Sequence, residues 1–195
     1  SEPYPNNLPS IFIPTTHGTA SEVTKWGTLW DMKGKKKFSI SNPSLYPDVA
    51  ILDGSILLSL PLDISIISSL DALSHSFESI WNVNANSEST QYAIVAICLI
   101  LENIDDLKND PSNLQTRNKL LEAANIAGLA FSSTATAAAH SISYPLTIHY
   151  NIPHGIASSL SLVPLLKINM KYIEKPLRAI CKKSRFSKEE LINKI

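Results

Sequence analysis

The pattern of apolar and polar positions divides the chain into two unequal parts. Before about residue 55, apolar residues come in short runs between proline and polar clusters, which is typical of strands and turns. Later apolar positions recur every three or four residues, which predicts helices over residues 63–82, 87–107, 115–130, 136–146 and 155–169 and from residue 187 onward. We therefore expect a mainly α chain, with an α/β part over residues 1–55 and an all-helical part over residues 56–195.

The first part contains the expected strands. Residues 10–15 (SIFIPT) and 44–53 (SLYPDVAILD) are short and largely apolar, which is typical of buried strands in a parallel sheet. Between them, residues 27–40 resemble a hairpin that turns around residues 32–34. Residues 1–10 are rich in proline and asparagine, and they are expected to form a loop.

Charge and composition narrow the classes of function. Lys plus Arg and Asp plus Glu are equal, at 17 each, so no net field favours nucleic acid or an anionic membrane as a partner. The longest apolar run, residues 92–101, is too short to cross a bilayer. Cys98 lies in this run and Cys181 is far from it in sequence, so two free thiols are favoured over a disulfide. A cytoplasmic protein is the expectation.

One aspartate and three histidines are the candidates for chemistry. Asp71 and His75 lie four residues apart, and on a helix this spacing places both side chains on one face. His140 and His154 follow among small and apolar residues. One carboxylate and three imidazoles suit Fe²⁺ or Zn²⁺, and spacing does not choose between these metals. A lone histidine is more often structural, so the joint pattern is what predicts a metal site.

Glu78 lies three residues beyond His75 on the same predicted helix, and two interpretations of it are open. It could accept a hydrogen bond from a metal-binding imidazole, as carboxylates commonly do in such sites. It could equally be a solvated glutamate on the protein surface.

Three motifs together resemble the iron-containing alcohol dehydrogenase family, whose catalytic part is a helical domain related in fold to dehydroquinate synthase. The motifs are PTTHGTASEVT at residues 14–24, DALSH at residues 71–75, and His140 followed by PHG at residues 153–155. The resemblance covers about residues 11–169, with the motifs in the family's order. It implies that the metal ligands are Asp71, His75, His140 and His154.

The resemblance also implies a nicotinamide cofactor, NAD(H) or NADP(H). The positions that match cofactor contacts form a threonine-rich loop, a lysine and an aromatic residue: Thr15, Thr16, Gly18, Thr19, Lys37 and Phe131. The chain departs from the family where His17 and Ala20 replace the usual Ala and Gly, and where Tyr144 replaces a histidine found in many members. A phenol is a poorer proton shuttle near neutral pH than an imidazole, so the proton relay is predicted to use Tyr144, His149 or water.

The function implied by the resemblance is hydride transfer between NAD(P) and a small alcohol or aldehyde at a divalent metal. Residues 79–86 and the segment around His140 are similar to the branch of the family associated with phosphonate metabolism, whose members reduce phosphonoacetaldehyde. Lys25 is a candidate contact for an anionic substrate. No nucleic-acid or membrane partner is expected, and a homodimer is an open expectation.

The chain has six glycines and no glycine-rich phosphate-binding run, so we expect a fragment that lacks the nucleotide domain of the family and ends before the helical domain is complete. Two alternatives to an active alcohol dehydrogenase therefore stay open. Such a fragment could be a non-catalytic remnant that keeps the metal-binding helices. It could also belong to an enzyme of the same fold with other chemistry, such as a glycerol dehydrogenase or a dehydroquinate-synthase-like lyase.

Overall fold

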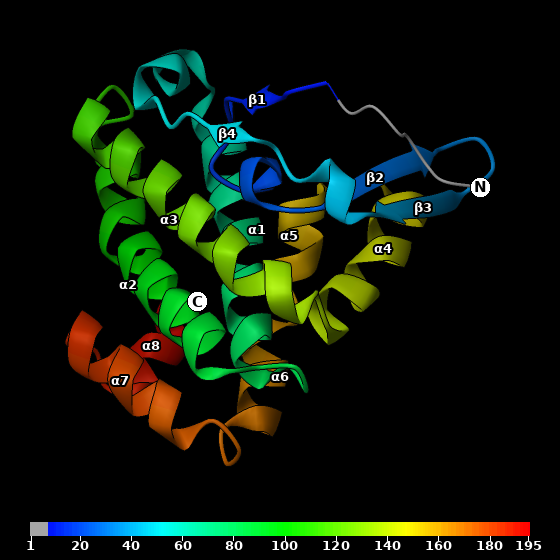
Figure 1. The fold of residues 1–195 in the computed structure, drawn as a ribbon. Helices are drawn as coiled ribbons and strands as arrows, with labels where there is room; N and C mark the ends of the chain where they lie inside the picture. The colour runs from blue at the N-terminus through cyan, green and yellow to red at the C-terminus, as the bar shows by residue number, and fades with distance from the viewer. Residues whose placement is uncertain (1–7) are drawn as a thin grey trace.

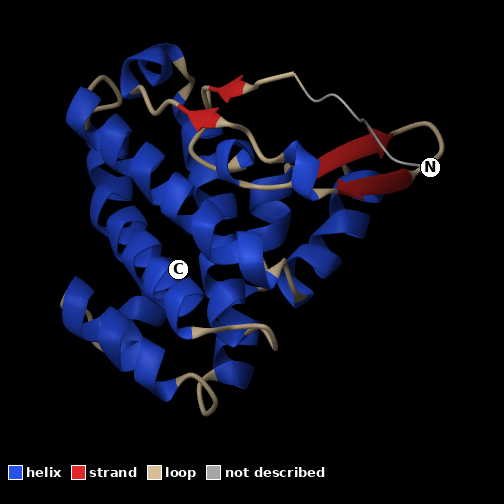
Figure 2. Ribbon diagram, viewed as in Figure 1, coloured by secondary structure: helices blue, strands red, loops and turns tan. Residues whose placement is uncertain are grey.

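The structure is a computed structural model that describes residues 8–195, so most of the loop predicted over residues 1–10 lies outside the described residues. The prediction of a mainly helical chain is confirmed (Figure 2). The helices are α1 (Leu62–Trp81), α2 (Ser87–Asn109), α3 (Leu114–Thr134), α4 (Ala138–Tyr150), α5 (His154–Ser159), α6 (Leu162–Asn169), α7 (Glu174–Ser184) and α8 (Lys188–Lys194). The strands are β1 (Ile11–Phe12), β2 (Trp26–Asp31), β3 (Lys36–Ser41) and β4 (Val49–Ala50), and the 3₁₀ helices are η1 (Ser21–Val23), η2 (Pro43–Leu45) and η3 (Gly54–Ser59).

Local sequence sets where the long helices begin. The Asn86 side chain accepts a hydrogen bond from the Ser89 backbone N–H at 2.9 Å, and the Ser89 hydroxyl accepts one from the Asn86 N–H at 3.0 Å. This reciprocal cap satisfies two backbone donors at the start of α2. Asn113 caps α3 in a similar way, through the Thr116 N–H at 3.1 Å.

The hydrophobic core lies between α1, α2 and α3, which pack against one another on the left of Figure 1, with α7 against α2. Small side chains allow close approach of these helices, including Ala93 and Ala96 on α2 and Ala124 and Ala127 on α3. Both cysteines are free, as predicted, and Cys98 is buried in this core. No helix within residues 8–195 is long and apolar enough to cross a membrane.

One predicted helix was wrong, and one helix was missed. The single helix expected over residues 155–169 is divided into α5 and α6. Pro164 lies in the first turn of α6, and a proline cannot donate to the carbonyl four residues earlier, at Leu160, so a continuous helix is interrupted there. Helix α7 was not predicted, because charged residues surround the buried positions Leu177, Ile180 and Ser184, which recur every three or four residues.

The strand predictions were correct in type and wrong in burial. Strands β1 and β4 pair in parallel, with Ile11 opposite Val49. They are only two residues long, and Ile11 and Val49 are 61% and 46% exposed. In the described part of the chain these strands form a sheet of two, and the short η1 helix packs beside them.

The predicted hairpin is present as β2 and β3, which pair antiparallel. Its turn is closed by the Asp31 carboxylate, which accepts a hydrogen bond from the Gly34 N–H at 2.8 Å. The hairpin lies beside α4, at the end of the molecule opposite α7 (Figure 1). The Lys35 ammonium donates to the Ile148 carbonyl at 2.9 Å, which attaches the hairpin turn to α4.

Candidate functional site

Helices α1 and α5 bring three of the four predicted metal ligands near one another by approaching each other closely. Residues 71–80 of α1 are all buried, so Asp71 and His75 project into the interior of the protein. His154 is the first residue of α5, and Gly155 follows it against α1. A Cβ atom on Gly155 would overlap the Ile67 carbonyl of α1, so only glycine permits this approach.

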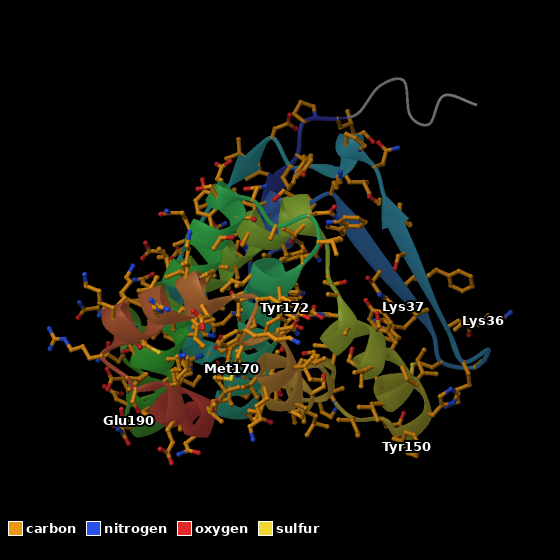
Figure 3. The ribbon with its side chains drawn as sticks, turned by 90° about the horizontal axis from the view of Figure 1, so that it is seen from below. Lys36, Lys37, Tyr150, Met170, Tyr172 and Glu190 are labelled. Atoms are coloured by element: carbon orange, nitrogen blue, oxygen red, sulfur yellow. The ribbon has the colours of Figure 1, made fainter. Side chains whose placement is uncertain are left out.

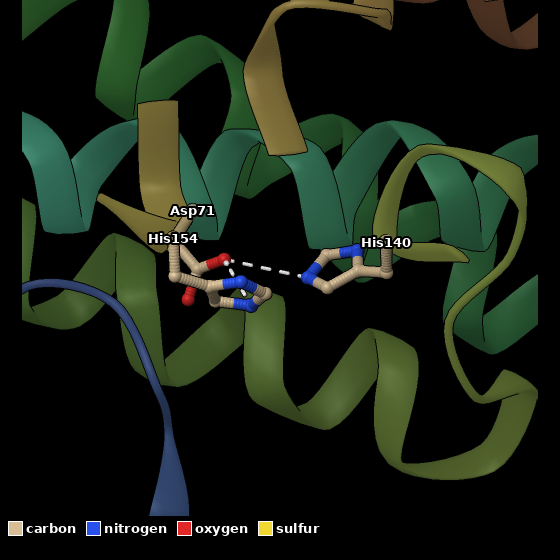
Figure 4. Close-up of side chains that lie close together, drawn as sticks. All are labelled: Asp71, His140 and His154. Atoms are coloured by element: carbon tan, nitrogen blue, oxygen red, sulfur yellow. Dashed lines mark ion pairs between the residues drawn. The ribbon is translucent and has the colours of Figure 1, made fainter. Parts of the chain in front are cut away.

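Asp71, His140 and His154 come together where α1, α4 and α5 meet (Figure 4). The Asp71 Oδ1 atom lies 3.3 Å from His140 Nε2 and 3.7 Å from His154 Nε2. One ligand atom from each of the three residues lies within 4.8 Å of the other two. His140 Nε2 is buried and has no well-directed hydrogen bond to any described residue. This donor set, one carboxylate and two imidazoles, fits a divalent iron or zinc ion.

His75 lies beside this cluster but is not one of the three residues gathered in it. Its ring stacks between two others, at 4.0 Å from Phe131 and 4.4 Å from His140, measured between ring centroids. Its Nδ1 atom is buried without a hydrogen-bond partner in the described part of the chain. His75 as a fourth ligand therefore remains a prediction.

Glu78 is fully buried, which excludes the surface interpretation of this residue. Its Oε2 atom lies 2.5 Å from His140 Nδ1. Its Oε1 atom accepts hydrogen bonds from the backbone N–H groups of Ala139 and His140 at 2.6 and 3.2 Å. The carboxylate thus fixes the orientation of the His140 ring, with Nε2 directed toward Asp71.

The electrostatics of the cluster favour a bound cation. Burial alone would raise the pKa of the Asp71 carboxyl, but the nearby imidazoles, His75 foremost, hold that pKa well below its usual range. Burial lowers the pKa of His75 to about 4, and it also lowers the pKa of His154. Burial alone would lower the pKa of His140, but the carboxylates of Asp71 and Glu78 raise it to about 10. A divalent metal would therefore displace a proton from His140, whereas the ionised Asp71 and the neutral His75 and His154 are already in the state that metals require.

A cavity of about 420 Å³ lies next to this cluster, and the three residues of the cluster form part of its wall. The metal-site candidates and Phe131 line one side of it, and the β2–β3 hairpin lines the other. The lining residues are Thr19, Ser21, Thr24, Trp26, Gly27, Thr28, Trp30, Lys37, Ser39, Asp71, His75, Phe131, Ala135, Thr136, His140, Tyr144 and His154.

The structure brings some predicted residues to this cavity and leaves others outside its lining. Of the predicted cofactor contacts, Thr19, Lys37 and Phe131 line it, and so does Tyr144. Thr15 is exposed and Thr16 half-buried outside the lining, and Gly18 is buried against Ser68 of α1, where a Cβ atom would lie 2.6 Å from a carbonyl oxygen. His149 is exposed on α4 and Lys25 is half-buried, and neither lines the cavity.

Sequence reasoning missed the inner face of the hairpin. Trp26, Thr28 and Trp30 alternate along β2, and Lys37 and Ser39 alternate along β3. Alternating side chains of a strand lie on one face, so this pattern could have indicated a common surface. Only Lys37 was selected, because the sequence alone does not show which face of a hairpin meets the helices.

In a comparison with known proteins, a protein-family model matches each of the two parts of the chain. Residues 65–194 match the model described as Fe-containing alcohol dehydrogenase family, C-terminal, and residues 1–54 match the model described as iron-containing alcohol dehydrogenase. The chain is 34% identical over 159 residues to phosphonoacetaldehyde reductase of Streptomyces viridochromogenes, which covers 82% of this chain and 40% of that protein. It is 32% identical over 178 residues to 1-propanol dehydrogenase of Citrobacter freundii, which covers 91% of this chain and 47% of that protein.

The fold is also similar to solved structures. Sulfoacetaldehyde reductase from Bifidobacterium kashiwanohense, in complex with NAD⁺, matches with a TM-score of 0.89 and 33% identity over 97% of this chain and 50% of that one. The chain thus spans half or less of the length of these relatives.

Proposed function

Because the chain belongs to the iron-containing alcohol dehydrogenase family, we propose that it takes part in NAD(H)-dependent interconversion of a small alcohol and its aldehyde at a divalent metal. The observation that carries this proposal is the gathering of Asp71, His140 and His154 at the floor of a cavity whose other side is aromatic and hydroxyl-bearing. Such a cavity has room for a flat ring and a short aldehyde.

The residues of the chain would hold and orient the reactants. Asp71, His140 and His154, with His75 beside them, would bind Fe²⁺ or Zn²⁺, and Glu78 would keep the His140 ring in place. When bound, the metal supplies a Lewis acid for the carbonyl oxygen, and the nicotinamide supplies hydride. Phe131 and Thr19, which both line the cavity, would contact the nicotinamide.

Proton transfer is assigned to Tyr144 rather than His149. The Tyr144 ring stacks with the His154 ring at 6.1 Å between centroids, and Tyr144 is one of the residues that line the cavity. The Tyr144 hydroxyl could donate a hydrogen bond to the oxygen that gains charge during reduction. His149 is exposed to solvent and outside the cavity lining, which leaves it without a direct role in this scheme.

For the substrate we propose a short aldehyde, with phosphonoacetaldehyde as the first candidate. Two of the relatives described above are reductases of phosphonoacetaldehyde and sulfoacetaldehyde, which are two-carbon aldehydes that carry an acidic group. The cavity contains one lysine, Lys37, and one carboxylate, Asp71, which lies in the metal cluster. An acidic substrate is compatible with this distribution of charge.

The experiment that tests the proposed function is elemental analysis of protein purified without chelator, with NADH oxidation measured in the presence of a short aldehyde. We expect about one Fe or Zn per chain, lost in His140→Ala and kept in His149→Ala, a matched change on the same helix. We also expect NADH oxidation to require both the metal and the aldehyde. A folded protein that binds no metal would overturn the proposal, and metal binding without turnover would favour the non-catalytic alternative.

A further inference from the structure

The η1 loop, defined as residues 19–23, contains a backbone conformation that favours glycine, yet the chain has an alanine there. Ala20 has φ 50° and ψ 35°, in the left-handed region, and its side chain is buried. A residue with a Cβ atom is disfavoured in this region, so tertiary contacts must hold Ala20 in place. The contacts of Ala20 therefore indicate what the loop is fixed against.

Helix α3 receives the Ala20 side chain at a glycine. Gly128 of α3 is buried, and a Cβ atom there would overlap the Cβ atom of Ala20 and would lie 2.6 Å from the Val23 Cγ2 atom. The helix thus lacks a side chain at the point where the loop supplies a methyl group. Ala20 and Gly128 are complementary, with one methyl group filling the space between loop and helix.

A second contact fixes the η1 loop one turn earlier on α3. Glu22 is buried, and its Oε1 atom accepts a hydrogen bond from the Asn125 side-chain amide at 2.9 Å. Asn125, Gly128 and Phe131 follow one another at intervals of three residues, so successive members are neighbours on the surface of α3. The loop is therefore attached to α3 directly beside the turn that carries Phe131.

This attachment brings two hydroxyl groups next to an aromatic ring at the cavity. Thr19 and Ser21 flank Ala20 in sequence, and their hydroxyl oxygens lie 3.2 Å apart. Both residues line the cavity, and so does Phe131. The contact between Ala20 and Gly128 thus sets the separation between the hydroxyl groups on the loop and the ring on α3.

The hairpin, which forms the opposite wall of the cavity, is supported by α4 instead. Lys37 lies on the side of the hairpin that faces α4, whereas Lys36 points away from the molecule (Figure 3). The Lys37 ammonium lies 3.4 Å from the centroid of the Tyr144 ring of α4. A displacement of the η1 loop on α3 is therefore expected to change one wall of the cavity and to leave the metal-site candidates in place.

We propose that Ala20 and Gly128 are a positioning pair, which holds the η1 loop at the distance from Phe131 that a nicotinamide ring needs. The inference rests on the proposed function and deepens it, because it assigns the placement of the cofactor contacts to two residues outside the cavity lining. A methyl group added at Gly128 would push the loop outward. Removal of the methyl group of Ala20 would instead free the loop to move on α3.

Titration with NADH tests the positioning pair without requiring turnover. Energy transfer from tryptophan to the reduced nicotinamide is the readout, because Trp26 and Trp30 line the cavity. We expect NADH to bind at least about tenfold more weakly to Gly128→Ala and about twofold to fivefold more weakly to Ala20→Gly. In the double variant Ala20→Gly/Gly128→Ala the methyl group moves from loop to helix, and the affinity should return to within about threefold of the unmodified chain.

Two further measurements separate positioning from a general loss of structure. Zn²⁺ affinity should stay within about twofold in all three variants, since the predicted ligands lie on α1, α4 and α5. Glu122→Ala, at an exposed position of α3, is the matched control and should leave NADH affinity unchanged. A pair with a merely structural role would change the free energy of unfolding and would not weaken NADH binding relative to Zn²⁺ binding.

Two results would overturn the inference alone. One is equal NADH affinity in Gly128→Ala and the unmodified chain, and the other is a double variant that binds NADH as weakly as Gly128→Ala. If Gly128→Ala does not fold, unchanged NADH affinity in Ala20→Gly, which only removes atoms, overturns the inference. Failure of the proposed function is recognised in the unmodified chain, by the absence of bound metal or of saturable NADH binding, and the inference would then fall with it.

Discussion

Glu78 shows how one buried side chain can organise a metal site from outside it. It receives three contacts from the start of α4, two from backbone N–H groups and one from the His140 ring. Its pKa is lowered despite burial, which by itself would raise it, because of the hydrogen bond with His140. The carboxylate therefore serves both as a cap for the helix and as a support for the predicted ligand.

We predict that Glu78→Gln weakens metal binding by about tenfold to a hundredfold, because the amide is a weaker acceptor for the imidazole N–H. Titration with Zn²⁺ in the presence of a competing chelator measures this change. Glu122→Gln on α3, where the glutamate is exposed, is the control and should leave the affinity unchanged. Equal affinities in all three proteins would show that Glu78 does not position the ligand.

For single residues, the sequence was informative where the number of residues between two side chains fixes their relative position on a helix. The four-residue separation of Asp71 and His75 correctly placed both side chains on the buried face of one helix. The role of Glu78 stayed open because its partner, His140, is 62 residues away in sequence. Only the packing of α4 on α1 brings the two together.

Gly155 sets the distance between α5 and α1. A Cβ atom at this position would meet the Ile67 backbone, which is part of a helix and cannot rotate away. The position of His154 relative to Asp71 thus depends on the absence of a side chain at the next residue.

We predict that Gly155→Ala lowers the free energy of unfolding by about 1–3 kcal/mol, through overpacking between α5 and α1. Metal affinity should fall with it, since His154 moves with α5. Chemical denaturation and Zn²⁺ titration measure the two effects. In the control Gly27→Ala the new Cβ would lie 3.8 Å from the Ile40 Cβ, an ordinary contact, and both quantities should be nearly unchanged. A variant as stable as the unmodified protein would contradict the close approach.

Elements were predictable from the sequence where periodicity was long and uninterrupted. The helices over α1, α2 and α3 were expected to within a few residues, because each has a buried stripe over five turns or more. Helix α7 was missed and α5 and α6 were joined, since short helices depend on single residues such as Pro164 and on the core that they cover. The boundary proposed near residue 55 stays a prediction.

The first part of the chain is docked on the helices through a buried histidine. His17 is fully buried, and its backbone N–H donates to the Ser68 hydroxyl of α1 at 3.2 Å. Burial, together with the charge of Arg117 on α3, lowers the pKa of its imidazole to about 4. Arg117 itself is buried and donates to Leu60, Ser65 and Pro111. A proton on His17 would therefore oppose the packing of the two parts.

We predict that this histidine makes the whole molecule less stable in mild acid. In the unfolded chain it binds a proton near pH 6.5, and in the folded chain only near pH 4, so stability falls as the pH decreases between these values. His17 should contribute about 2–3 kcal/mol of this loss, and His17→Ala should lose that much less stability. The loss that remains in His17→Ala belongs to other groups such as His75, whose pKa is also about 4.

Urea denaturation at pH 7 and at pH 4.5 measures this difference. His149→Ala, which alters an exposed histidine, is the control and should keep the pH dependence of the unmodified protein. If His17→Ala loses as much stability as the unmodified chain over this range, other titrating groups are responsible.

The cavity was beyond what the sequence could predict, because its two sides come from separate parts of the molecule. The predicted ligands lie on helices that were expected, whereas Trp26, Thr28 and Ser39 line the cavity only because the hairpin lies beside α4. That contact depends on tertiary interactions such as the hydrogen bond from Lys35 to the Ile148 carbonyl.

The hairpin register also has a consequence for how such a protein can change during evolution. Successive residues of a strand face opposite sides, so a shift of β3 by one position would turn Lys37 and Ser39 outward and Phe38 and Ile40 into the cavity. A change of one residue in the length of the turn at residues 32–35 is one way to produce that shift. Such a shift would exchange a polar for an apolar cavity lining without any substitution near the metal-site candidates.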